Sequence, residues 1–481
     1  MDVVARIVAL EAQLELVLAE NERLSDENER LRVRVAELES RAGKNSSNSS
    51  MPPSGDDASG RAERAKRASQ RPKSGRKPGG QRGRRGNTMR RVDDPDRTVL
   101  HRPVSCGACG AGLASAPEHG RRSRRQVFDV VDRPVEVTEH QTVTCRCACG
   151  HDSTGVFPPE ATGPAVWGPK TAALAVTLVI RQHIPYQRAA EILAGIGAPV
   201  SVGWIVTQVA RAAALLVDWL ARLRVRLHAA AVLHADETSA RVAGATWWFH
   251  VASTSLLTLL VAHRSRGQAA VDDAGVLGAM DGILVHDRAA MYWNYAGTRH
   301  GLCIAHLCRD LAGIATHPRH RTWANAMRSV LYDAKTICDT ARQRGDPTLT
   351  ADEFATINTR YRAALGAALE TCDPCEHPDA NTKGIHRDAR NLSAAFFEHE
   401  TEILAFTTNL AIPFDNNQAE RDLRMAKIAQ KISYGWRTPE GVQHFATIRS
   451  YIETGRKHGH HTIDLLTQLF TTDPWTIPHP T

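Results

Sequence analysis

Two aspartates each follow an apolar stretch of the sequence, and a glutamate lies in a polar block far downstream. Asp236 and Asp287 end runs that read as buried β-strands, and a histidine comes shortly before each of them. If the two strands are neighbours in one sheet, both carboxylates project at the same edge. Glu420, on a helix that crosses this edge, would complete a cluster of three acids.

Such a cluster indicates metal-dependent chemistry on phosphodiesters. Three close carboxylates repel one another and cannot all stay ionised without cations. Mg²⁺ or Mn²⁺ would resolve this, because hard divalent ions prefer oxygen ligands. Two such ions about 4 Å apart can activate a water or a 3′-hydroxyl and stabilise the leaving oxygen of a phosphodiester. We therefore predict that Asp236, Asp287 and Glu420 are catalytic and bind Mg²⁺ (or Mn²⁺).

Glu420 has a competing structural interpretation. It shares a helix face with Asn417 and Arg424. Asn417 could cap the helix, and Glu420, three residues later, could close a capping box. A glutamate used in this way could not freely bind a metal. The two aspartates favour the catalytic role, and we then expect Asp415 or Asn416 to cap the helix instead.

Basic side chains and histidines accompany the acids. We expect basic residues on and after the Glu420 helix to neutralise DNA phosphates; they are Arg421, Arg424, Lys427 and Lys431. His286 and His306 either orient ligands or phosphates or only pack against their neighbours.

The pattern around the acids is typical of a mixed α/β domain with a ribonuclease-H-like core. Apolar and alternating stretches predict three adjoining strands, a helix, a fourth strand and a possible fifth. These lie at 231–242, 246–252, 256–262, 268–280, 282–287 and 301–306. A mostly helical insertion at about 307–404 delays the last core helix. Amphipathic helices at 442–456 and 463–470 follow.

The N-terminus has a coiled-coil pattern over nearly five heptads. Position a holds Ile7, Leu14, Asn21, Asn28 and Val35, and position d holds Leu10, Val17, Leu24, Leu31 and Leu38. Leucine at d with asparagine at a favours a parallel two-stranded coil, so we predict a homodimer through this zipper. The alternative is a single amphipathic helix packed on its own chain.

The positive charge is concentrated in one segment. The chain has 481 residues and a net charge of +8, but residues 61–91 contain thirteen Lys or Arg and one acid, a local +12, so the rest sums to −4. We predict a disordered arm that contacts DNA, including the minor groove. Its candidate DNA-binding residues are Arg76, Lys77, Arg82, Arg84 and Arg85. The alternative is a tail that only increases solubility.

Clustered cysteines predict structural zinc. Cys106 and Cys109 form one knuckle, and Cys147 and Cys149 form a second, for which Cys145 is a possible substitute. Four thiolates suit tetrahedral Zn²⁺. Alternation at 127–131 and 135–138 predicts strands between the knuckles. The pair at positions 372 and 375 lacks a partner pair and is interpreted as a loop.

We predict six regions and a reducing cytoplasmic location. The clustered cysteines fit a reducing cytosol better than a disulfide framework. Neither a signal peptide nor a membrane span is expected, because the N-terminus is charged and the apolar run at 172–180 is short. The regions are the zipper (1–42), basic linker (43–97), zinc-finger-like module (98–160), helical DNA-binding or packing region (165–228), catalytic domain (229–435) and C-terminal helices (436–481). The helical region contains a possible helix-turn-helix; packing beneath the next domain is the simpler interpretation.

Four motifs resemble those of insertion-sequence-66-type transposases. They are His234-Ala-Asp236-Glu-Thr, Val285-His-Asp287, Cys303-Ile-Ala-His306-Leu and Asp415-Asn-Asn-Gln-Ala-Glu-Arg-Asp-Leu-Arg424. The last block is the most specific. The zipper, linker, cysteine knuckles and C-terminal helices extend the resemblance over nearly the whole chain.

The resemblance implies a DDE transposase of ribonuclease-H-like fold, with Asp236, Asp287 and Glu420 as its metal-binding acids. It also implies that the zinc-finger-like region helps recognise transposon ends. Water would cut at the end of the element, and the freed 3′-hydroxyl would attack target DNA without ATP. The implied partners are double-stranded DNA and candidate accessory proteins of the same element. The resemblance also implies that the protein is associated with the nucleoid. The alternatives are a non-catalytic DNA-binding regulator and an inactive transposase copy.

Overall fold

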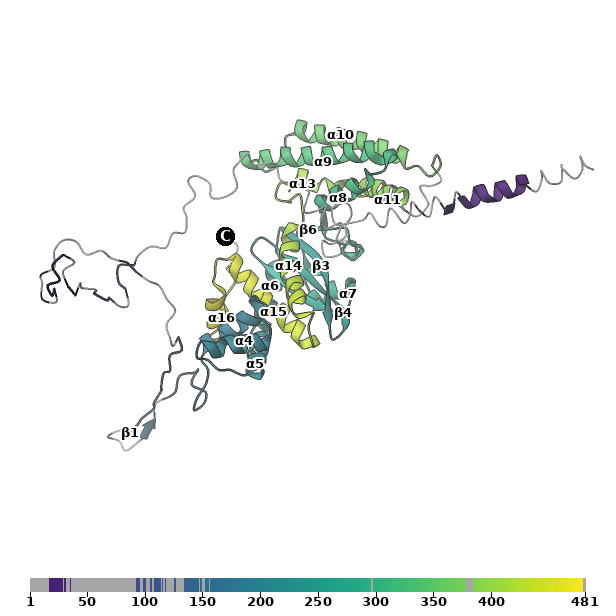
Figure 1. Ribbon diagram of the computed structural model, residues 1–481. Coiled ribbons are helices and arrows are strands. Elements are labelled where there is room, and N and C mark those ends of the chain that lie inside the picture. The colour runs from purple at the N-terminus through teal and green to yellow at the C-terminus, as the bar shows by residue number, and fades with distance from the viewer. Residues whose placement is uncertain are drawn as a thin grey trace, which may run out of the picture. The chain divides into compact units, whose positions relative to one another are not determined.

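The computed structural model describes most of the chain from residue 156 onward (Figure 1). The described residues are 17–28, 30–31, 35, short stretches and single positions between 92 and 154, and 156–478 without 296 and 378–383. The chain divides into two units, residues 1–66 with 139–481 and residues 67–138, and each is described by itself.

A five-stranded mixed sheet forms the centre of the larger unit. Its strands are β3 (Val232–Val242), β4 (Ala245–Ser253), β5 (Thr258–His263), β6 (Ile283–His286) and β7 (Arg299–Leu302). Their spatial order is β5-β4-β3-β6-β7, and β3, β4 and β5 run antiparallel while β6 and β7 run parallel to β3. Ala243 and Gly244, both with positive φ, form the two-residue turn between β3 and β4.

The first four predicted strands are confirmed, but two boundaries differ. β3 continues for six residues beyond Asp236, because its second half pairs with β4 after β6 has ended. The expectation that Asp236 ends its strand is therefore wrong. The fifth strand ends at Leu302, and the predicted strand residues 304–306 instead begin a helix.

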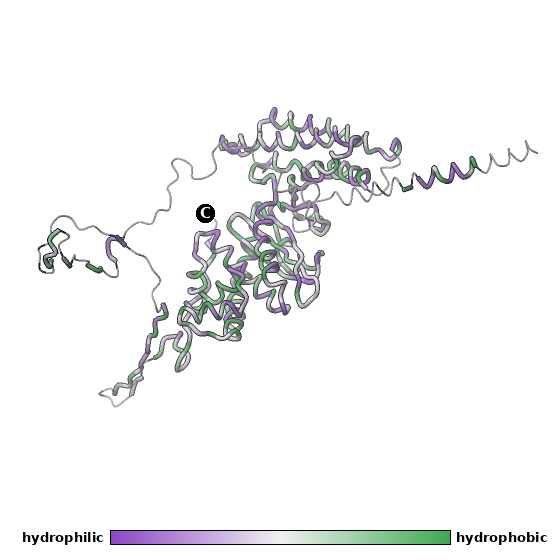
Figure 2. Tube along the Cα trace, viewed as in Figure 1, coloured by the Kyte–Doolittle hydropathy of each residue, from purple (hydrophilic) through white to green (hydrophobic). Residues whose placement is uncertain are grey.

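Helices follow β7 for about a hundred residues, as predicted. They are α8 (Ile304–Ile314), α9 (Pro318–Arg344), α10 (Ala351–Thr371), α11 (Ile385–Glu398), α12 (Glu400–Ile403) and α13 (Ala405–Thr408). Along α9 and α10, hydrophobic and hydrophilic residues follow one another at intervals of about one helical turn (Figure 2). The hydrophobic residues, such as Trp323, Leu331 and Tyr361, are buried in one core.

The last core helix, α14 (Asn417–Ser433), packs on β3 and β4. Its end is tied to β3, because the backbone of Trp436 bonds to both Arg241 and Ala243. Gly435, with a φ of 122°, permits this approach: a Cβ at Gly435 would lie 2.4 Å from the Arg241 carbonyl oxygen. The helix that carries Glu420 is thereby fixed to the strand that carries Asp236.

Helices before and after the sheet pack together. The earlier ones are α3 (Pro169–Val176), the π-helical turn η1 (Thr177–Arg181), α4 (Tyr186–Gly195), α5 (Val202–Leu215) and α6 (Val217–His228). The later ones are α15 (Pro439–Lys457) and α16 (Thr462–Thr471). α16 packs on α3, and α15 on α5 and β5. The indole of Trp219 donates to the Trp475 carbonyl over 2.8 Å. The packing role predicted for 165–228 is therefore present, and the helix-turn-helix stays a prediction.

The N-terminal and cysteine-rich regions are described in part. Residues 17–28 are helical, with the d-position side chains Val17 and Leu24 exposed. β1 (Thr144–Arg146) pairs with β2 (Asp152–Thr154) in a hairpin. Residues 135–138 form no strand, contrary to the prediction, since alternation alone supplies no pairing partner. The predicted strand 127–131 lies outside the described residues.

Candidate active site

Asp236 and Asp287 lie beside each other at the point where β6 ends. The parallel register pairs His234 with Val285. Asp236 and Asp287 each lie two residues further along, so they occupy neighbouring positions. Asp236 is within β3 and is half-buried, and its carboxylate accepts a hydrogen bond from the Glu237 N–H over 2.8 Å. Because the strands are parallel, the predicted meeting of two carboxylates at one edge follows from the fold.

The electrostatics of this edge are those of crowded negative charge. Burial, followed by the charges of Asp287 and Glu237, raises the pKa of Asp236 well above its ordinary value, and Glu420 adds to the effect. Burial and Asp287 also raise the pKa of Glu237, although Arg266 and Tyr292 oppose this through hydrogen bonds. The site therefore has an excess of carboxylates that a cation would relieve.

Glu420 lies in the first turn of α14 and does not cap the helix. The Asp415 carboxylate instead accepts the Asn417 N–H over 3.0 Å, and Asn416 stands at the N-cap position. The capping box of Asn417 and Glu420 is therefore wrong, because Asn417 is already the first helical residue. The expectation that Asp415 or Asn416 caps the helix instead is confirmed.

Two side chains of α8 face Glu420. Its Oε1 lies 3.6 Å from a guanidinium nitrogen of Arg309 and 3.9 Å from Nε2 of His306. Burial raises the pKa of Glu420, the charge of Arg309 opposes this, and Asp415 and Asp287 act in the same direction as burial. Burial and nearby arginines lower the pKa of His306 to about 3, so this imidazole is neutral at pH 7.

The charge of Asp287 raises the pKa of both Asp236 and Glu420, but the three acids are not drawn tightly together. Within the part of the chain that the structure describes, the group of three potential ligands whose atoms all lie within 4.8 Å is His317, His320 and His386, which lies elsewhere. The acidic site nevertheless suits a hard divalent ion chemically, since its donors are all carboxylate oxygens and burial and like charge raise the pKa of Asp236.

Comparison with known families gives a direct match to this part of the chain. Residues 164–444, more than half of the chain, match the model of the transposase IS66 family. The chain belongs to this transposase family. Residues 3–90 match a second family, whose function is unknown. A search of curated proteins found no match.

Asn416, which the sequence indicates only as a helix cap, also belongs to the candidate site. It is buried, its amide donates to the Ala235 carbonyl over 2.7 Å, and its Oδ1 lies 2.8 Å from Nδ1 of His234. Its own N–H bonds to the Cys303 sulfur over 3.2 Å. Asn416 thus ties the start of α14 to β3 directly before Asp236. Its place inside the acidic block was the available signal.

A polar pocket opens beside Asp287. It has a volume of about 310 Å³ and is lined by Arg266, Asp287, Arg288, Ala289, Trp293, Ala395 and His399. Asp287 accepts the Ala289 N–H over 3.1 Å, and Arg288 has a φ of 76°, which is uncommon for a residue with a side chain. Trp293 stacks on His399 with ring centroids 4.3 Å apart. The pocket offers two cations and an aromatic face next to a predicted catalytic acid.

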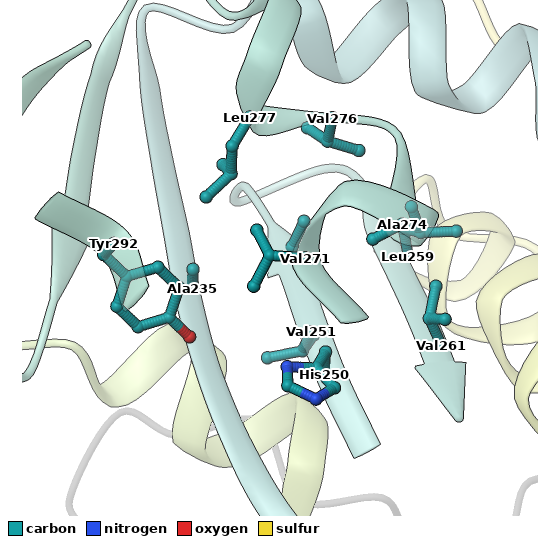
Figure 3. Close-up of a pocket in the computed structure, with 11 residues that line it drawn as sticks. Ala235, His250, Val251, Leu259, Val261, Val271, Ala274, Val276, Leu277 and Tyr292 are labelled. Carbon is teal, nitrogen blue, oxygen red and sulfur yellow. The ribbon is translucent and has the colours of Figure 1, made fainter. Parts of the chain in front are cut away.

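A second, apolar cavity lies between the strands β3, β4 and β5 and the segment 271–277 (Figure 3). Ala235, His250, Val271, Leu277 and Tyr292 are among the residues that line it, and its volume is only about 20 Å³. Such a space holds at most one water, so it is a packing gap. Tyr292, at its edge, donates to Glu237 over 3.0 Å.

Of the two histidines predicted near the acids, His286 has a packing role. It is buried, its Nδ1 accepts the Arg288 N–H over 3.1 Å and its Nε2 lies 3.1 Å from Nδ1 of His300. Both ring nitrogens are therefore occupied. The imidazole of His306, in contrast, lies beside the Glu420 carboxylate.

The predicted phosphate-binding residues on α14 differ in exposure. Arg421, Arg424 and Lys431 are exposed, whereas Lys427 is bound to the backbone and hydroxyl oxygens of Ser239. Lys427 is therefore a structural link to β3 and not a free phosphate contact.

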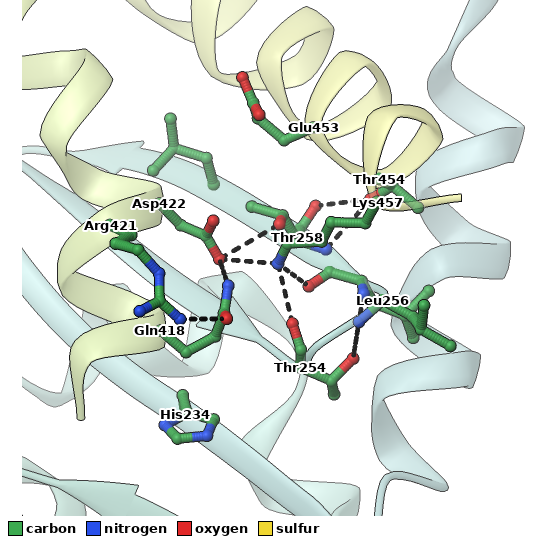
Figure 4. A network of polar contacts seen from close by, with 12 residues as sticks. His234, Thr254, Leu256, Thr258, Gln418, Arg421, Asp422, Glu453, Thr454 and Lys457 are labelled. Atoms are coloured by element: carbon green, nitrogen blue, oxygen red, sulfur yellow. Dashed lines mark hydrogen bonds and ion pairs between the residues drawn. The ribbon is translucent and has the colours of Figure 1, made fainter. Parts of the chain in front are cut away.

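A polar network on the other face of α14 holds the helix in place (Figure 4). Asp422 accepts from Lys457 over 2.8 Å, from Gln418 over 3.0 Å and from Thr258 over 3.3 Å. Lys457 also bonds to the carbonyls of Thr254 and Leu257. This partly buried ion pair joins α14, α15 and the β4–β5 connection.

The zinc and DNA-arm predictions fall largely outside the described residues. Cys106, Cys147 and Cys149 are not described, and the described Cys109 and Cys145 are both exposed. Arg76, Lys77, Arg82, Arg84 and Arg85 are not described either. Among the described helices, none alone is long and apolar enough to cross a membrane, and only the bent pair α5–α6 meets that test, by length and composition.

Proposed function

We propose that this transposase cuts and joins DNA with Asp236, Asp287 and Glu420 as its catalytic acids. The observation that carries the proposal is the parallel pairing of β3 and β6, which brings Asp236 and Asp287 together. The order β5-β4-β3-β6-β7, with three antiparallel strands followed by two parallel ones, supports a ribonuclease-H-like core. The family match supports the reaction class.

Asp236, Asp287 and Glu420 would hold Mg²⁺ or Mn²⁺. When bound, these ions supply activation of a water or 3′-hydroxyl and stabilisation of the leaving oxygen. Hydrolysis at the end of the element frees a 3′-hydroxyl. The oxygen of this hydroxyl then attacks a phosphodiester of the target and forms a new P–O bond, while the 3′-oxygen of the target strand leaves as a hydroxyl.

Neighbouring side chains position the acids for this reaction. Arg309 opposes the rise in the pKa of Glu420, and Asn416 fixes the helix of Glu420 against the strand of Asp236. Arg266 and Arg288 provide positive charge on the wall of the pocket beside Asp287, where a phosphate of the DNA backbone could bind.

The remaining regions would bring DNA and a second chain to this site. The basic arm at 61–91 would bind phosphates of transposon ends and target, and the cysteine knuckles would hold structural Zn²⁺. The zipper would form a homodimer. Accessory proteins of the same element and association with the nucleoid belong to this proposal.

The direct test is metal-dependent cleavage of the DNA ends that flank the gene. Glu420→Gln removes a charge without changing shape, so we expect loss of both cleavage and strand transfer. Glu440→Gln, an exposed glutamate in the first turn of α15, is the matched control and should retain activity. Equal activity in Glu420→Gln and the wild type would refute the assignment of the third acid.

A further inference from the structure

Three imidazoles meet in the helical insertion, away from the acids. One ring nitrogen from each of His317, His320 and His386 lies within 4.8 Å of the others. His320 is almost fully buried, and the other two are half-buried. Imidazole nitrogens are preferred ligands of Zn²⁺ and other first-row divalent ions.

The local structure fixes these rings in place. His317 is the N-cap of α9, and its Nδ1 accepts the Arg319 N–H over 3.3 Å. Pro318 follows at the first helical position, which its fixed φ favours. His320 comes one turn later on the same helix end, and His386 is the second residue of α11. The cluster therefore joins the starts of two helices that are more than sixty residues apart in sequence.

The hydrogen bonds of His320 show where a metal would enter. Its Nε2 lies 2.8 Å from Nδ1 of His386, so in the metal-free protein one proton is shared between two ring lone pairs. On the other side of the ring, Nδ1 accepts a hydrogen bond from the Trp323 indole N–H over 3.3 Å and lies 3.9 Å from the Cys372 sulfur. A divalent ion on Nε2 would replace the shared proton, and the proton of the neutral ring would then be on Nδ1. Nδ1 would change from an acceptor of the Trp323 indole to a donor, and the Cys372 sulfur could accept from it.

One of the two cysteines at positions 372 and 375 lies beside the histidine cluster: the Cys372 sulfur is 3.9 Å from Nδ1 of His320. Cys372 is the buried C-cap residue of α10, whereas Cys375 is exposed in the turn that follows. The Cys372 sulfur lies near Nδ1 of His320, whereas the metal would bind at Nε2 on the other side of the ring. The sulfur would thus act from behind His320, in the second layer around the metal.

We propose that His317, His320 and His386 form a Zn²⁺ site, with solvent as the fourth ligand. The site would clamp the start of α9, the end of α10 and the start of α11. This inference does not depend on the catalytic assignment, and it is separate from the zinc predicted at the cysteine knuckles.

The clamp would also set one wall of the pocket beside Asp287. Ala395 and His399, at the far end of α11, line that pocket. His399 lies thirteen positions after His386, which at 1.5 Å per residue corresponds to roughly 20 Å. A metal at the first turn of α11 would therefore fix the position of His399 at the other end of this helix, and with it the Trp293 ring that stacks on His399.

The test is zinc content of the purified full-length chain. His386→Gln and, separately, His317→Gln should each lower bound zinc by about one ion per chain. His461→Gln, an exposed histidine just before α16, is the matched control and should bind as much zinc as the wild type. Zinc content unchanged in both ligand variants would overturn the proposal.

Cobalt substitution distinguishes this site from the cysteine knuckles. Subtracting the spectrum of Co²⁺-loaded His386→Gln from that of the wild type should leave a tetrahedral Co²⁺ band without thiolate charge transfer. A thiolate band in this difference would refute the three-imidazole ligand set. Cys372→Ser should keep the ion but weaken its binding by about 10–100-fold, the range for second-layer partners. Because His317 is at the helix end and half-buried, its variant remains informative if replacement of a deeper ligand prevents folding.

Discussion

Asn416 and His234 are joined by a buried contact of 2.8 Å between Oδ1 and Nδ1. The residues are 182 positions apart, and the contact links the N-terminus of α14 to β3. The same amide donates to the Ala235 carbonyl. One asparagine therefore sets the distance between the helix of Glu420 and the strand of Asp236.

Replacing this asparagine should damage both stability and activity. Asn416→Ala leaves the Ala235 carbonyl and the His234 ring without their partner in a buried place, which typically costs about 1–3 kcal/mol. Urea unfolding should show a lower midpoint, and DNA cleavage should fall further than the loss of folded protein explains. The exposed neighbour Asn417→Ala is the control. An unchanged midpoint in Asn416→Ala would contradict this role.

Removing the charge of Asp236 should stabilise the metal-free protein while abolishing cleavage. Its raised pKa means that the ionised carboxylate opposes folding at neutral pH. The folded state binds the proton more tightly, so this penalty grows as the pH rises from the unfolded pKa of about 3.9 to the folded pKa, and is then constant. Asp236→Asn should therefore unfold at higher urea at neutral pH in chelator, and the difference should shrink on acidification.

The control for this comparison is Asp93→Asn, which changes an exposed carboxylate outside helices and strands. It should unfold as the wild type does at every pH. If Asp236→Asn is no more stable than the wild type in chelator at neutral pH, the ionised Asp236 carboxylate does not destabilise the folded protein.

Divalent ions should stabilise the wild type through the same carboxylates. A ligand that binds only the folded state at a hundred times its dissociation constant adds about 2.7 kcal/mol. We expect Mg²⁺ or Mn²⁺ to raise the thermal midpoint of the wild type and to have little effect on Asp236→Asn. Carrying out the Mg²⁺ and Mn²⁺ titrations in excess NaCl excludes a general effect of ionic strength. Equal shifts in both proteins would place the binding ion elsewhere.

Arg309 should control the acid side of the pH–activity profile. Its charge, 3.6 Å from Glu420, lowers the pKa of that carboxyl against the effect of burial. In Arg309→Ala the pKa of Glu420 rises, so a higher pH is needed to ionise it and the acidic limb moves to higher pH. Arg309→Lys keeps a positive charge and should move it less. A profile that keeps its shape while the maximum falls would indicate a purely structural role for Arg309.

The N-terminal helix should make the protein a dimer. Val17 and Leu24, both d positions, are exposed in the single chain, with 56% and 44% of their surface accessible. Leu24→Asp places a charge in the predicted seam and should yield a monomer by light scattering. Glu22→Ala, at a b position that faces away from the seam, should leave the dimer intact. A dimeric Leu24→Asp protein would show that other surfaces associate the chains.

The sequence by itself determined the local elements and the chemical types at the site. Alternating and apolar runs predict β3 to β6 because side-chain burial on a strand follows a period of two, and the acids were recognisable because they interrupt these runs. The helix of Glu420 was likewise visible from its 3.6-residue period.

Only the tertiary structure decided how far each element extends and which distant residues meet. β3 continues beyond Asp236 because β4 remains its partner after β6 has ended. Asn416 meets His234, and His386 meets His320, across separations of 182 and 66 residues. Local patterns record the burial of a side chain but not the identity of the group it faces, because that identity depends on how whole helices and strands pack together.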